Sequence, residues 1–455
     1  MSIKVSKRIL PKMVFGIIGV FIFFIGALSG FPIPNFVALY VLFLSIYLAW
    51  WSKDNCLFLI MFAVLAYSNY SIAFSEYVVV KANTLFTRYA GTYEANIGIY
   101  IMLLFWSVLM FALPASVPAF TSSSYKDYWR TEKKNSIQFV YALALNFLLV
   151  LIWIFGFTRP TEIGGRGAPS AIYEYSIIFF ILCYYFAGKF KSIKISTTVI
   201  LMLYVLQNFV FGGRITGLQV LILFYLMCME EKYSLKKILP IVVGLFVVLF
   251  FIGAYRGNWL RTDFSLTNVW EALKDNLFTL DTAYSSYHTS LTFLLYGEGV
   301  STSVKMGVFS NFLKSIILGG YGTAENSVAH LTANFYAHYD GGVLPFFFYF
   351  FMGWQGVILI ALYVSIFVRQ LTKIPADTTG LKKCLLVYFV ATAFRWYLYS
   401  PIQLTRGVLL MVLAFVLSDL GIKTLSKSGG TEEEYLTDNY YPLFAHNLQL
   451  AGGAA

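Results

Sequence analysis

Long apolar runs recur along the whole chain, and their length and pattern predict the fold class. Runs of about 16 to 22 residues are long enough for a helix to cross the hydrocarbon core of a bilayer. Their polarity does not alternate from one residue to the next, as the strands of a membrane barrel require. The pattern therefore predicts an all-α integral membrane protein, because each span must satisfy its own backbone polar groups. We expect about twelve spans, at 13–29, 36–51, 56–74, 96–117, 137–157, 170–187, 195–211, 214–230, 238–254, 343–366, 383–398 and 407–421.

The composition agrees with a membrane protein and argues against several other classes. Of 455 residues, 59% are hydrophobic and only 12% are charged, whereas a soluble domain carries about 25% charged residues. We interpret the net charge of +11 through the location of the basic residues, which indicates membrane topology. No nucleic-acid partner is expected. The four cysteines lie within or beside apolar runs, so the sequence predicts no disulfide framework and no metal site. No metal or other cofactor is expected.

The basic residues between the spans predict the orientation of the chain. The N-terminus is basic, and so is every second loop, near 53, 126–134, 189–194, 232–237 and 369–383. Cytoplasmic loops carry an excess of Lys and Arg. We therefore expect both termini of this multi-pass protein to be cytoplasmic.

The spans divide the chain into four predicted regions. Nine helices form an N-terminal transmembrane region at 1–254, and three form a C-terminal one at 343–422. Between them, 255–342 is a long outer loop, far longer than an ordinary connection. Helical spacing of apolar residues predicts two amphipathic helices in it, one capped by Ser265 and one containing Phe309, Phe312 and Ile316. The polar tail at 423–455 is expected to be disordered and cytoplasmic.

Lysine and arginine are distributed differently on this topology. Of 22 lysines 18 lie on the cytoplasmic side, whereas eight of 11 arginines lie outside or at outer helix ends. Topology selection treats the two residues alike, but arginine is preferred where a planar donor must hold phosphate or carboxylate. Arg88, Arg159 and Arg166 have acidic residues nearby in sequence, whereas Arg214, Arg395 and Arg406 abut apolar runs without one. This segregation predicts an outward-facing site for a lipid diphosphate.

The long loop holds the candidate acid and base groups. They are His330, His338, Asp340 and Glu325. A diphosphate is a good leaving group, fixed positive charge stabilises it as the bond breaks, and the attacking hydroxyl needs only a base to orient it. His330, Asn334 and His338 are spaced one helical turn apart and would share a face if the segment were helical. The alternative for these polar residues is an interfacial helix with no catalytic role.

Three features of the sequence resemble the O-antigen polymerases, or oligosaccharide-repeat-unit polymerases of the Wzy type, and more distantly the O-antigen ligases. One is the turn Gly212-Gly213-Arg214 that opens a helix. Another is Tyr255-Arg256-Gly257 at the start of the long loop. The last is the loop's end, from Glu325-Asn326-Ser327 through Asn334-Phe335-Tyr336 to Asp340-Gly341-Gly342. The similarity by motif covers roughly 195–365, and by layout the whole chain.

The resemblance implies a GT-C-like glycosyltransferase in the bacterial inner membrane that works without a metal. It would join undecaprenyl-diphosphate-linked oligosaccharides, as donor and acceptor, into O-antigen or a related surface polysaccharide. Arg214, Arg256, Arg261, Arg395 and Arg406 would hold diphosphate, and Asn334 and Tyr336 belong to the loop motif. Membrane lipids and a chain-length regulator are the other expected partners. His330 is offset by a few residues from the histidine that the ligases carry.

Three other functions remain open at this point. A lipid-linked oligosaccharide flippase also has about twelve helices, but it is expected to show internal repeats and short loops. An O-antigen ligase shares the donor chemistry and differs in its acceptor. A non-catalytic membrane scaffold would not need the segregation of arginine from lysine.

Overall fold

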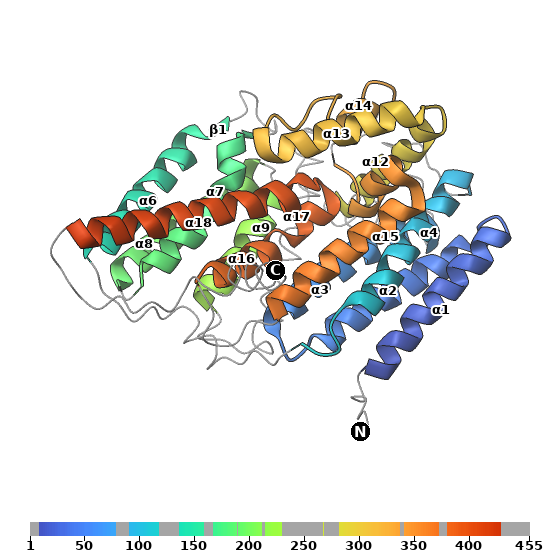
Figure 1. Ribbon diagram of the computed structural model, residues 1–455, viewed down its shortest axis with the longest axis horizontal. Helices are drawn as coiled ribbons and strands as arrows, with labels where there is room; N and C mark the ends of the chain where they lie inside the picture. Colours follow the sequence, from blue (N-terminus) through green and yellow to red (C-terminus); the bar gives the residue numbers. More distant parts are fainter. Residues whose placement is uncertain are drawn as a thin grey trace, which may run out of the picture.

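Helices make up almost all of the computed structural model (Figure 1). It describes residues 9–78, 91–117, 136–158, 167–188, 190–211, 214–229, 267, 282–336, 341–372 and 380–428. Eight of its helices are long and apolar enough to cross a membrane, and two shorter ones are also apolar. The chain is therefore an all-α membrane protein, as the apolar runs predict.

The helices of the N-terminal part match the predicted spans to within a few residues. They are α1 (Ile9–Leu28), α2 (Pro34–Trp51), α3 (Cys56–Ile72) with the π-helix η1 (Ala73–Val78), α4 (Tyr93–Ala112), α6 (Ser136–Phe155), α7 (Ala171–Phe186), α8 (Lys191–Phe211) and α9 (Arg214–Phe224) with the π-helix η2 (Tyr225–Met229). A two-residue antiparallel pair, β1 (Phe157–Thr158) with β2 (Ala168–Pro169), joins α6 to α7. The predicted span 238–254 lies outside the described residues.

Local sequence signals explain where several of these helices begin. Asn55, Thr92 and Ser170 each precede a helix, and the side-chain oxygen of each accepts a bond from the backbone N–H three residues on. Such caps satisfy donors that the first turn of a helix leaves unpaired.

The C-terminal helices are α15 (Leu344–Thr372), α16 (Gly380–Ala391), α17 (Ala393–Leu398) and α18 (Ile402–Ser428). The run at 383–398, predicted as one helix, is broken at Thr392 into α16 and α17. A second interruption lies in α15, where Gly353 has non-helical dihedrals of φ 63° and ψ −147°. The predicted start of the polar tail at 423 is wrong in detail, because α18 continues to Ser428; residues 429–455 lie outside the described part.

The long loop is not a surface connection throughout. It contains α12 (Thr282–Glu298), α13 (Thr302–Leu318) and α14 (Val328–Thr332). The amphipathic helix predicted around Phe309 is confirmed as part of α13, whereas the one predicted after Ser265 lies outside the described residues. Nearly every side chain of α12 from Ala283 to Leu294 is buried, and the helix packs against α3, α4, α14 and α15. Because the helix contains many Ser and Thr residues, its sequence is not a long apolar run, and the sequence pattern did not predict it.

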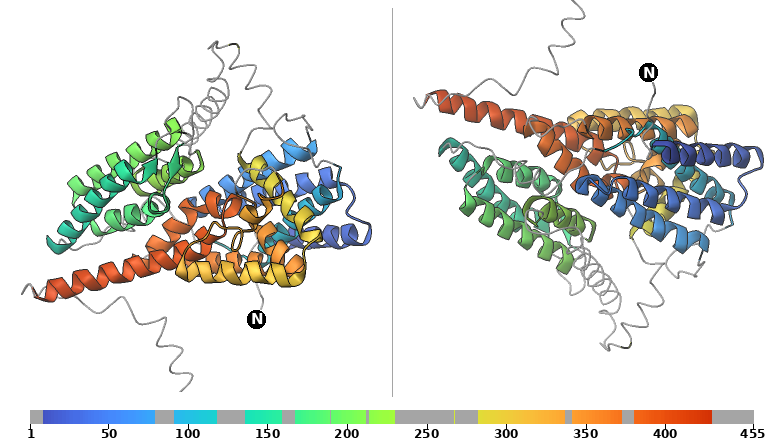
Figure 2. Two further views of the ribbon diagram at one scale, coloured as in Figure 1. Left: turned by 90° about the horizontal axis from the view of Figure 1, so that it is seen from above. Right: turned by 90° about the horizontal axis from the view of Figure 1, so that it is seen from below.

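The helices form two groups that a third set joins (Figures 1 and 2). The first group contains α1, α2, α3, α4, α12 and α15. The second group contains α6, α7, α8 and α9. The bridging helices α16 and α17 contact both groups, α16 packing on α3, α7 and α9 and α17 on α3 and α9, while α18 packs on α6, α7, α13 and the two other bridging helices.

A buried polar cluster lies inside the first group, where η1 meets α12 and α4. Tyr284 donates a hydrogen bond of 3.0 Å to Oε2 of the buried Glu76. The Tyr77 hydroxyl donates to the Ala95 carbonyl at 2.6 Å and contacts the hydroxyl of Tyr287. We call these four side chains, Glu76, Tyr77, Tyr284 and Tyr287, the tyrosine cluster. Glu76 and Tyr77 lie in the π-helix η1, and all four side chains are buried, so hydrogen bonds are needed to offset the burial of their polar groups.

Candidate functional site: an arginine junction between the helix groups

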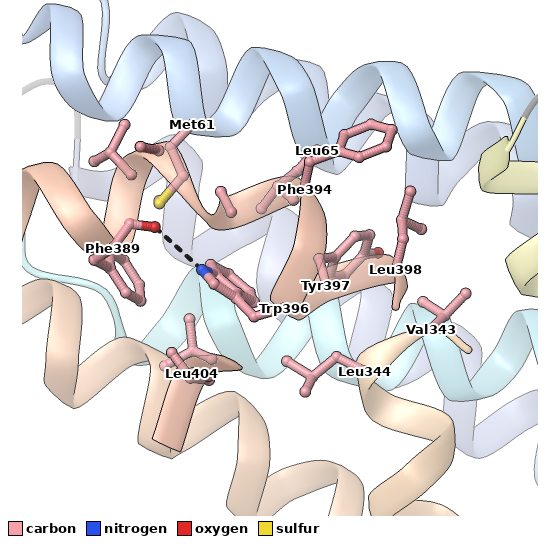
Figure 3. Packing of buried hydrophobic residues seen from close by; sticks show 14 of the residues in the cluster. Met61, Leu65, Val343, Leu344, Phe389, Phe394, Trp396, Tyr397, Leu398 and Leu404 are labelled. Carbon is pink, nitrogen blue, oxygen red and sulfur yellow. Dashed lines mark hydrogen bonds between the residues drawn. The ribbon is translucent and has the colours of Figure 1, made fainter. Parts of the chain in front are cut away.

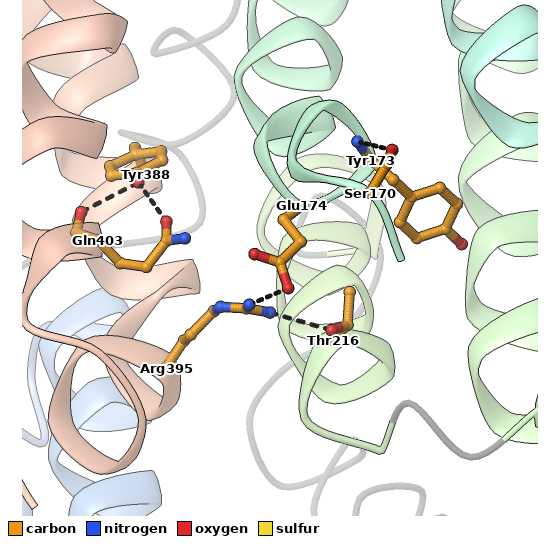
Figure 4. Close-up of polar contacts among 7 residues, drawn as sticks. All are labelled: Ser170, Tyr173, Glu174, Thr216, Tyr388, Arg395 and Gln403. Atoms are coloured by element: carbon orange, nitrogen blue, oxygen red, sulfur yellow. Dashed lines mark hydrogen bonds and ion pairs between the residues drawn. The ribbon is translucent and has the colours of Figure 1, made fainter. Parts of the chain in front are cut away.

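Arg395 lies where the bridging helix α17 faces the second helix group. Its side chain is buried, at 11% exposure, and forms an ion pair with Glu174 of α7. Nη1 also donates to Oγ1 of Thr216 in α9 at 3.1 Å (Figure 4). One guanidinium therefore connects three helices that are far apart in the sequence. A buried charge of this kind is stable only when it is paired and hydrogen-bonded.

The break at Thr392 gives α17 the direction that aims Arg395 at the second group. The Thr392 side chain donates to the Tyr388 carbonyl at 2.7 Å, and its own carbonyl accepts from the Arg395 and Trp396 N–H groups. After Leu398 the chain turns, and the N–H groups of Tyr399 and Ser400 donate to the Arg395 carbonyl. The backbone around Arg395 is thus fixed on both sides.

The other residues of α17 anchor it in the core of the first group (Figure 3). Trp396 and Tyr397 are both buried, and Trp396 Nε1 donates to the Phe389 carbonyl at 3.1 Å. Tyr397 donates to Asn69 at 2.9 Å and accepts from Trp106 at 3.0 Å. Because the anchor and the arginine share one short helix, the position of Arg395 depends on the packing of both groups.

Arg406 lies in the second turn of α18, near the same place. Its Cζ is 6.0 Å from the centre of the Tyr175 ring, within the range of a cation–π contact. Nη1 is 3.5 Å from the Ser315 carbonyl in the last turn of α13. Gly319, with φ +86°, ends α13 here, and a Cβ on it would lie 2.6 Å from Nη1. The guanidinium therefore packs on the carboxyl end of a helix, where positive charge is favoured.

Both guanidinium groups lie close enough to act electrostatically on Tyr175. We call Arg395, Arg406, Glu174, Tyr175 and Thr216 the arginine junction. The Nε atoms of Arg395 and Arg406 are buried and have no hydrogen-bond partner among the described residues. Buried donors are normally satisfied, so these two N–H groups are open to an acceptor that the described part of the chain does not supply.

A small-residue contact holds α18 in place beside the junction. The Tyr388 hydroxyl lies 3.1 Å from the Gln403 carbonyl oxygen and 3.3 Å from Gln403 Oε1 (Figure 4). A Cβ on Gly407 would lie 1.7 Å from that hydroxyl. Only glycine at this position lets α16 and α18 approach so closely.

The structure describes the other predicted diphosphate-binding arginines only in part or not at all. Arg214 is the first residue of α9, two positions before Thr216, and its side chain lies outside the described part. Arg256 and Arg261 also lie outside it. Of the five predicted diphosphate ligands, the structure thus brings Arg395 and Arg406 together and places the backbone of Arg214 at the start of the helix that Arg395 contacts.

His330 is exposed on the short helix α14, on the other side of the α13 end. Its Nδ1 is 3.0 Å from Oγ of Ser327. Its ring packs beside Gly322, 3.8 Å from where a Cβ would lie. The neighbouring Tyr321 is held neutral, because burial, the largest effect, raises its pKa even though the hydroxyls of Ser327 and Ser400 lower it. Ser327 thus links the imidazole to the segment that follows α13.

The remaining predicted loop residues do not form the shared helical face expected of them. The helix α14 ends at Thr332, so Asn334 lies in the turn beyond it, and the continuous helix on which the shared face of His330 and Asn334 depended is not present. Glu325 and Asn334 are exposed and Tyr336 is half-buried. His338 and Asp340 lie outside the described residues.

Two residues of this region were missed or undervalued by sequence reasoning. Glu174 is 221 positions from Arg395, so the absence of a neighbouring acid in sequence did not mean the absence of one in space. Asn326 organises the turn after α13: Oδ1 accepts from the N–H groups of Gly322 and Thr323, and Nδ2 donates to the Gly320 carbonyl. An Asn within a glycine-rich stretch is the signal that predicts such a turn.

The junction carries two guanidinium groups and one carboxylate, a formal excess of one positive charge in a partly buried place. Such a site can hold an anionic group, because fixed donors in a low dielectric interact strongly with it.

Among the described residues, no three His, Cys, Asp or Glu side chains lie together as metal ligands. Comparison with protein-family models, with curated proteins and with solved structures found no match.

Proposed function

We propose that this protein is a glycosyltransferase that polymerises undecaprenyl-diphosphate-linked oligosaccharide repeat units on the periplasmic face of the bacterial inner membrane. The proposal includes twelve spans in a GT-C-like arrangement, with both termini cytoplasmic. The loop and turn motifs that resemble the O-antigen polymerases support the class of reaction. The observation that carries the diphosphate site is that the buried Nε donors of Arg395 and Arg406 have no hydrogen-bond partner within the described ranges.

In this mechanism the guanidinium groups stabilise the leaving diphosphate as the sugar–oxygen bond breaks. Arg395 is oriented by Glu174 and Thr216, which leaves its remaining N–H donors for phosphate oxygens. Arg214 and Arg256 would add further donors to the same group. His330 or Asp340 would accept the proton from the attacking hydroxyl of the second lipid-linked repeat unit. No metal takes part in this proposal, so a chelator should leave activity intact.

A flippase for lipid-linked oligosaccharides is the second candidate, and one observation favours it. The buried Arg395–Glu174 ion pair connects two helix groups, and intramembrane ion pairs often line transport pathways. A ligase that uses the same donor is the third.

Surface polysaccharide after deletion and complementation separates these functions. Gel analysis of the deletion strain should show lipid A-core carrying a single repeat unit, and the wild-type gene should restore the long ladder. Bare lipid A-core would instead indicate a ligase, and repeat units trapped in the cytoplasm would indicate a flippase. Either of the last two outcomes overturns the proposal.

A further inference from the structure

A pocket of about 290 Å³ lies at the end of the first helix group, away from the arginine junction. Four helices line it. The first turn of α4 contributes Glu94, the last turn of α12 contributes Gly297 and Glu298, α13 contributes Lys305, and α15 contributes Tyr349 and Phe350. Its size falls near the lower end of small-molecule sites, about 300 to 1,000 Å³.

The lining combines an apolar wall with three charged side chains, of which Glu298 is exposed and Glu94 and Lys305 are half-buried. Phe350 and Phe293 are buried and form part of the wall. Lys305 Nζ lies 5.8 Å from the centre of the Phe350 ring. Neither Glu94 nor Glu298 forms an ion pair with Lys305 in the described structure. Tyr349 lies within electrostatic range of Glu298. Among the residues that the structure describes, the charged groups that line the pocket are therefore not paired with one another.

This chemistry favours one class of ligand. A lipid tail would bury three charged groups without hydrogen bonds, which is costly. A phosphate or uronic acid would meet a net negative lining, and a divalent cation would find only two carboxylates beside an ammonium group. A neutral or amino sugar fits, because its hydroxyls can donate to the carboxylates and accept from Lys305 while the aromatic wall covers its C–H face.

The helix α13 connects this pocket to the arginine junction. Lys305 lines the pocket, and the Ser315 carbonyl faces Arg406. Ten residues of helix separate the two, a span of about 15 Å. Figure 1 shows α13 lying across this end of the molecule, above α12 and α15. An oligosaccharide whose diphosphate occupies the junction can extend along α13 and place a later sugar ring in the pocket.

We infer that this pocket is a sugar-binding subsite that accepts neutral or amino sugars of the lipid-linked glycan and rejects acidic ones. The inference deepens the proposed function and rests on it for the identity of the natural ligand. Binding of free glycosides tests the pocket directly, because the measurement needs no polymerising activity.

The experiment measures saturation-transfer NMR on the full-length protein in detergent, with methyl glycosides of glucose, N-acetylglucosamine and glucuronic acid as probes. The first two should bind, and the glucuronide should bind at least about tenfold more weakly because of the net negative lining. Glu298→Gln should weaken the neutral probes by about tenfold through loss of a charge-assisted hydrogen bond. Gly297→Trp should abolish binding, because Gly297 lines the pocket and the indole would fill it. The Cβ itself fits, since its nearest neighbours would be Phe350 at 3.4 Å and Lys305 at 3.8 Å.

The matched control is Gly307→Trp, also in a helix, where a Cβ would meet open space; it should bind the probes as wild type does. Absence of glycoside binding, equal binding of the glucuronide, or undiminished binding by both Glu298→Gln and Gly297→Trp overturns the inference. Arg406→Ala separates it from the proposed function. That variant should keep glycoside binding, so failure of the diphosphate site would leave this result unchanged.

Discussion

The tyrosine cluster and the arginine junction both bury charged side chains, but they differ in where the partners come from. Glu76 receives its hydrogen bond from Tyr284, and both residues belong to the first helix group. Arg395 is anchored in the first group through its own helix but takes its counterion from the second. Among the described residues, the hydrogen bonds of the cluster join elements of one packed unit, whereas the ion pair of the junction forms only where two units meet. A site of the second kind suits a ligand that must enter between helices.

The largest expected effect comes from breaking the ion pair of the junction. Glu174→Gln should lower the free energy of unfolding by about 3 kcal/mol, because it leaves a buried guanidinium without a counterion. Thermal unfolding in detergent micelles measures this. Replacing both partners, with Glu174→Leu and Arg395→Met, should recover most of the loss. If Glu174→Gln is as stable as the wild type, the packing of the two helix groups does not depend on this ion pair.

Removing the second arginine should affect activity more than stability. Arg406→Ala should lower polymerisation of lipid-linked repeat units by about 10²-fold, the usual cost of losing one fixed donor to a developing negative charge. Arg406→Lys should restore it only in part, since a point charge replaces a planar donor. Chain length on gels and rate of repeat-unit consumption report the result.

The matched control is Arg369→Ala. Arg369 donates to the Ala112 carbonyl at 2.9 Å and lies in the last turn of α15, the end predicted to be cytoplasmic. The Arg369→Ala variant should retain near-normal polymerising activity. Equal losses in both variants would mean that arginine removal disturbs the membrane protein in general rather than a diphosphate site.

Replacement of the imidazole on α14 gives a prediction of similar size. If His330 is the base, His330→Ala should lower turnover by about 10²-fold. Ser327→Ala keeps the imidazole and removes the hydroxyl that contacts Nδ1 and Tyr321, so it should cost a few-fold at most. Activity of His330→Ala within a few-fold of wild type would assign it a structural role and leave Asp340 as the candidate.

The smallest effects are expected in the tyrosine cluster, and they concern stability alone. Tyr77→Phe should cost about 2 kcal/mol, because the Ala95 carbonyl and the Tyr287 hydroxyl lose their partner. Glu76→Gln should cost less than Glu174→Gln, since the amide oxygen can still accept the hydrogen bond from Tyr284. A loss in Glu76→Gln as large as that in Glu174→Gln would erase the distinction between the two regions.

The sequence predicted the membrane-embedded helices well because apolar length is a local property. Every predicted span within the described residues coincides with a helix, including the run that Thr392 divides. It did not predict α12, because burial of Ser286, Thr289 and Ser290 depends on the neighbouring helices rather than on local hydropathy. Propensity and hydropathy cannot report such tertiary packing.

The candidate site was predicted in part. The lack of a nearby acid drew attention to Arg395 and Arg406, and the structure places both at one junction. The same reasoning missed Glu174, since a partner from another helix leaves no signal at fixed spacing. The helical face proposed for His330 and Asn334 failed because four-residue spacing indicates a shared face only if the helix continues, and α14 ends at Thr332.

Binding of undecaprenyl diphosphate tests the central claim most directly. The purified full-length protein in lipid nanodiscs should bind undecaprenyl diphosphate more tightly than undecaprenyl monophosphate, since two guanidinium groups are available to the second phosphate. Arg406→Ala should weaken diphosphate binding by about tenfold or more and bring the two lipids to similar affinity, while Arg369→Ala should bind as wild type does. Equal binding of the two lipids by the wild-type protein, or unchanged diphosphate binding in Arg406→Ala, would contradict the account.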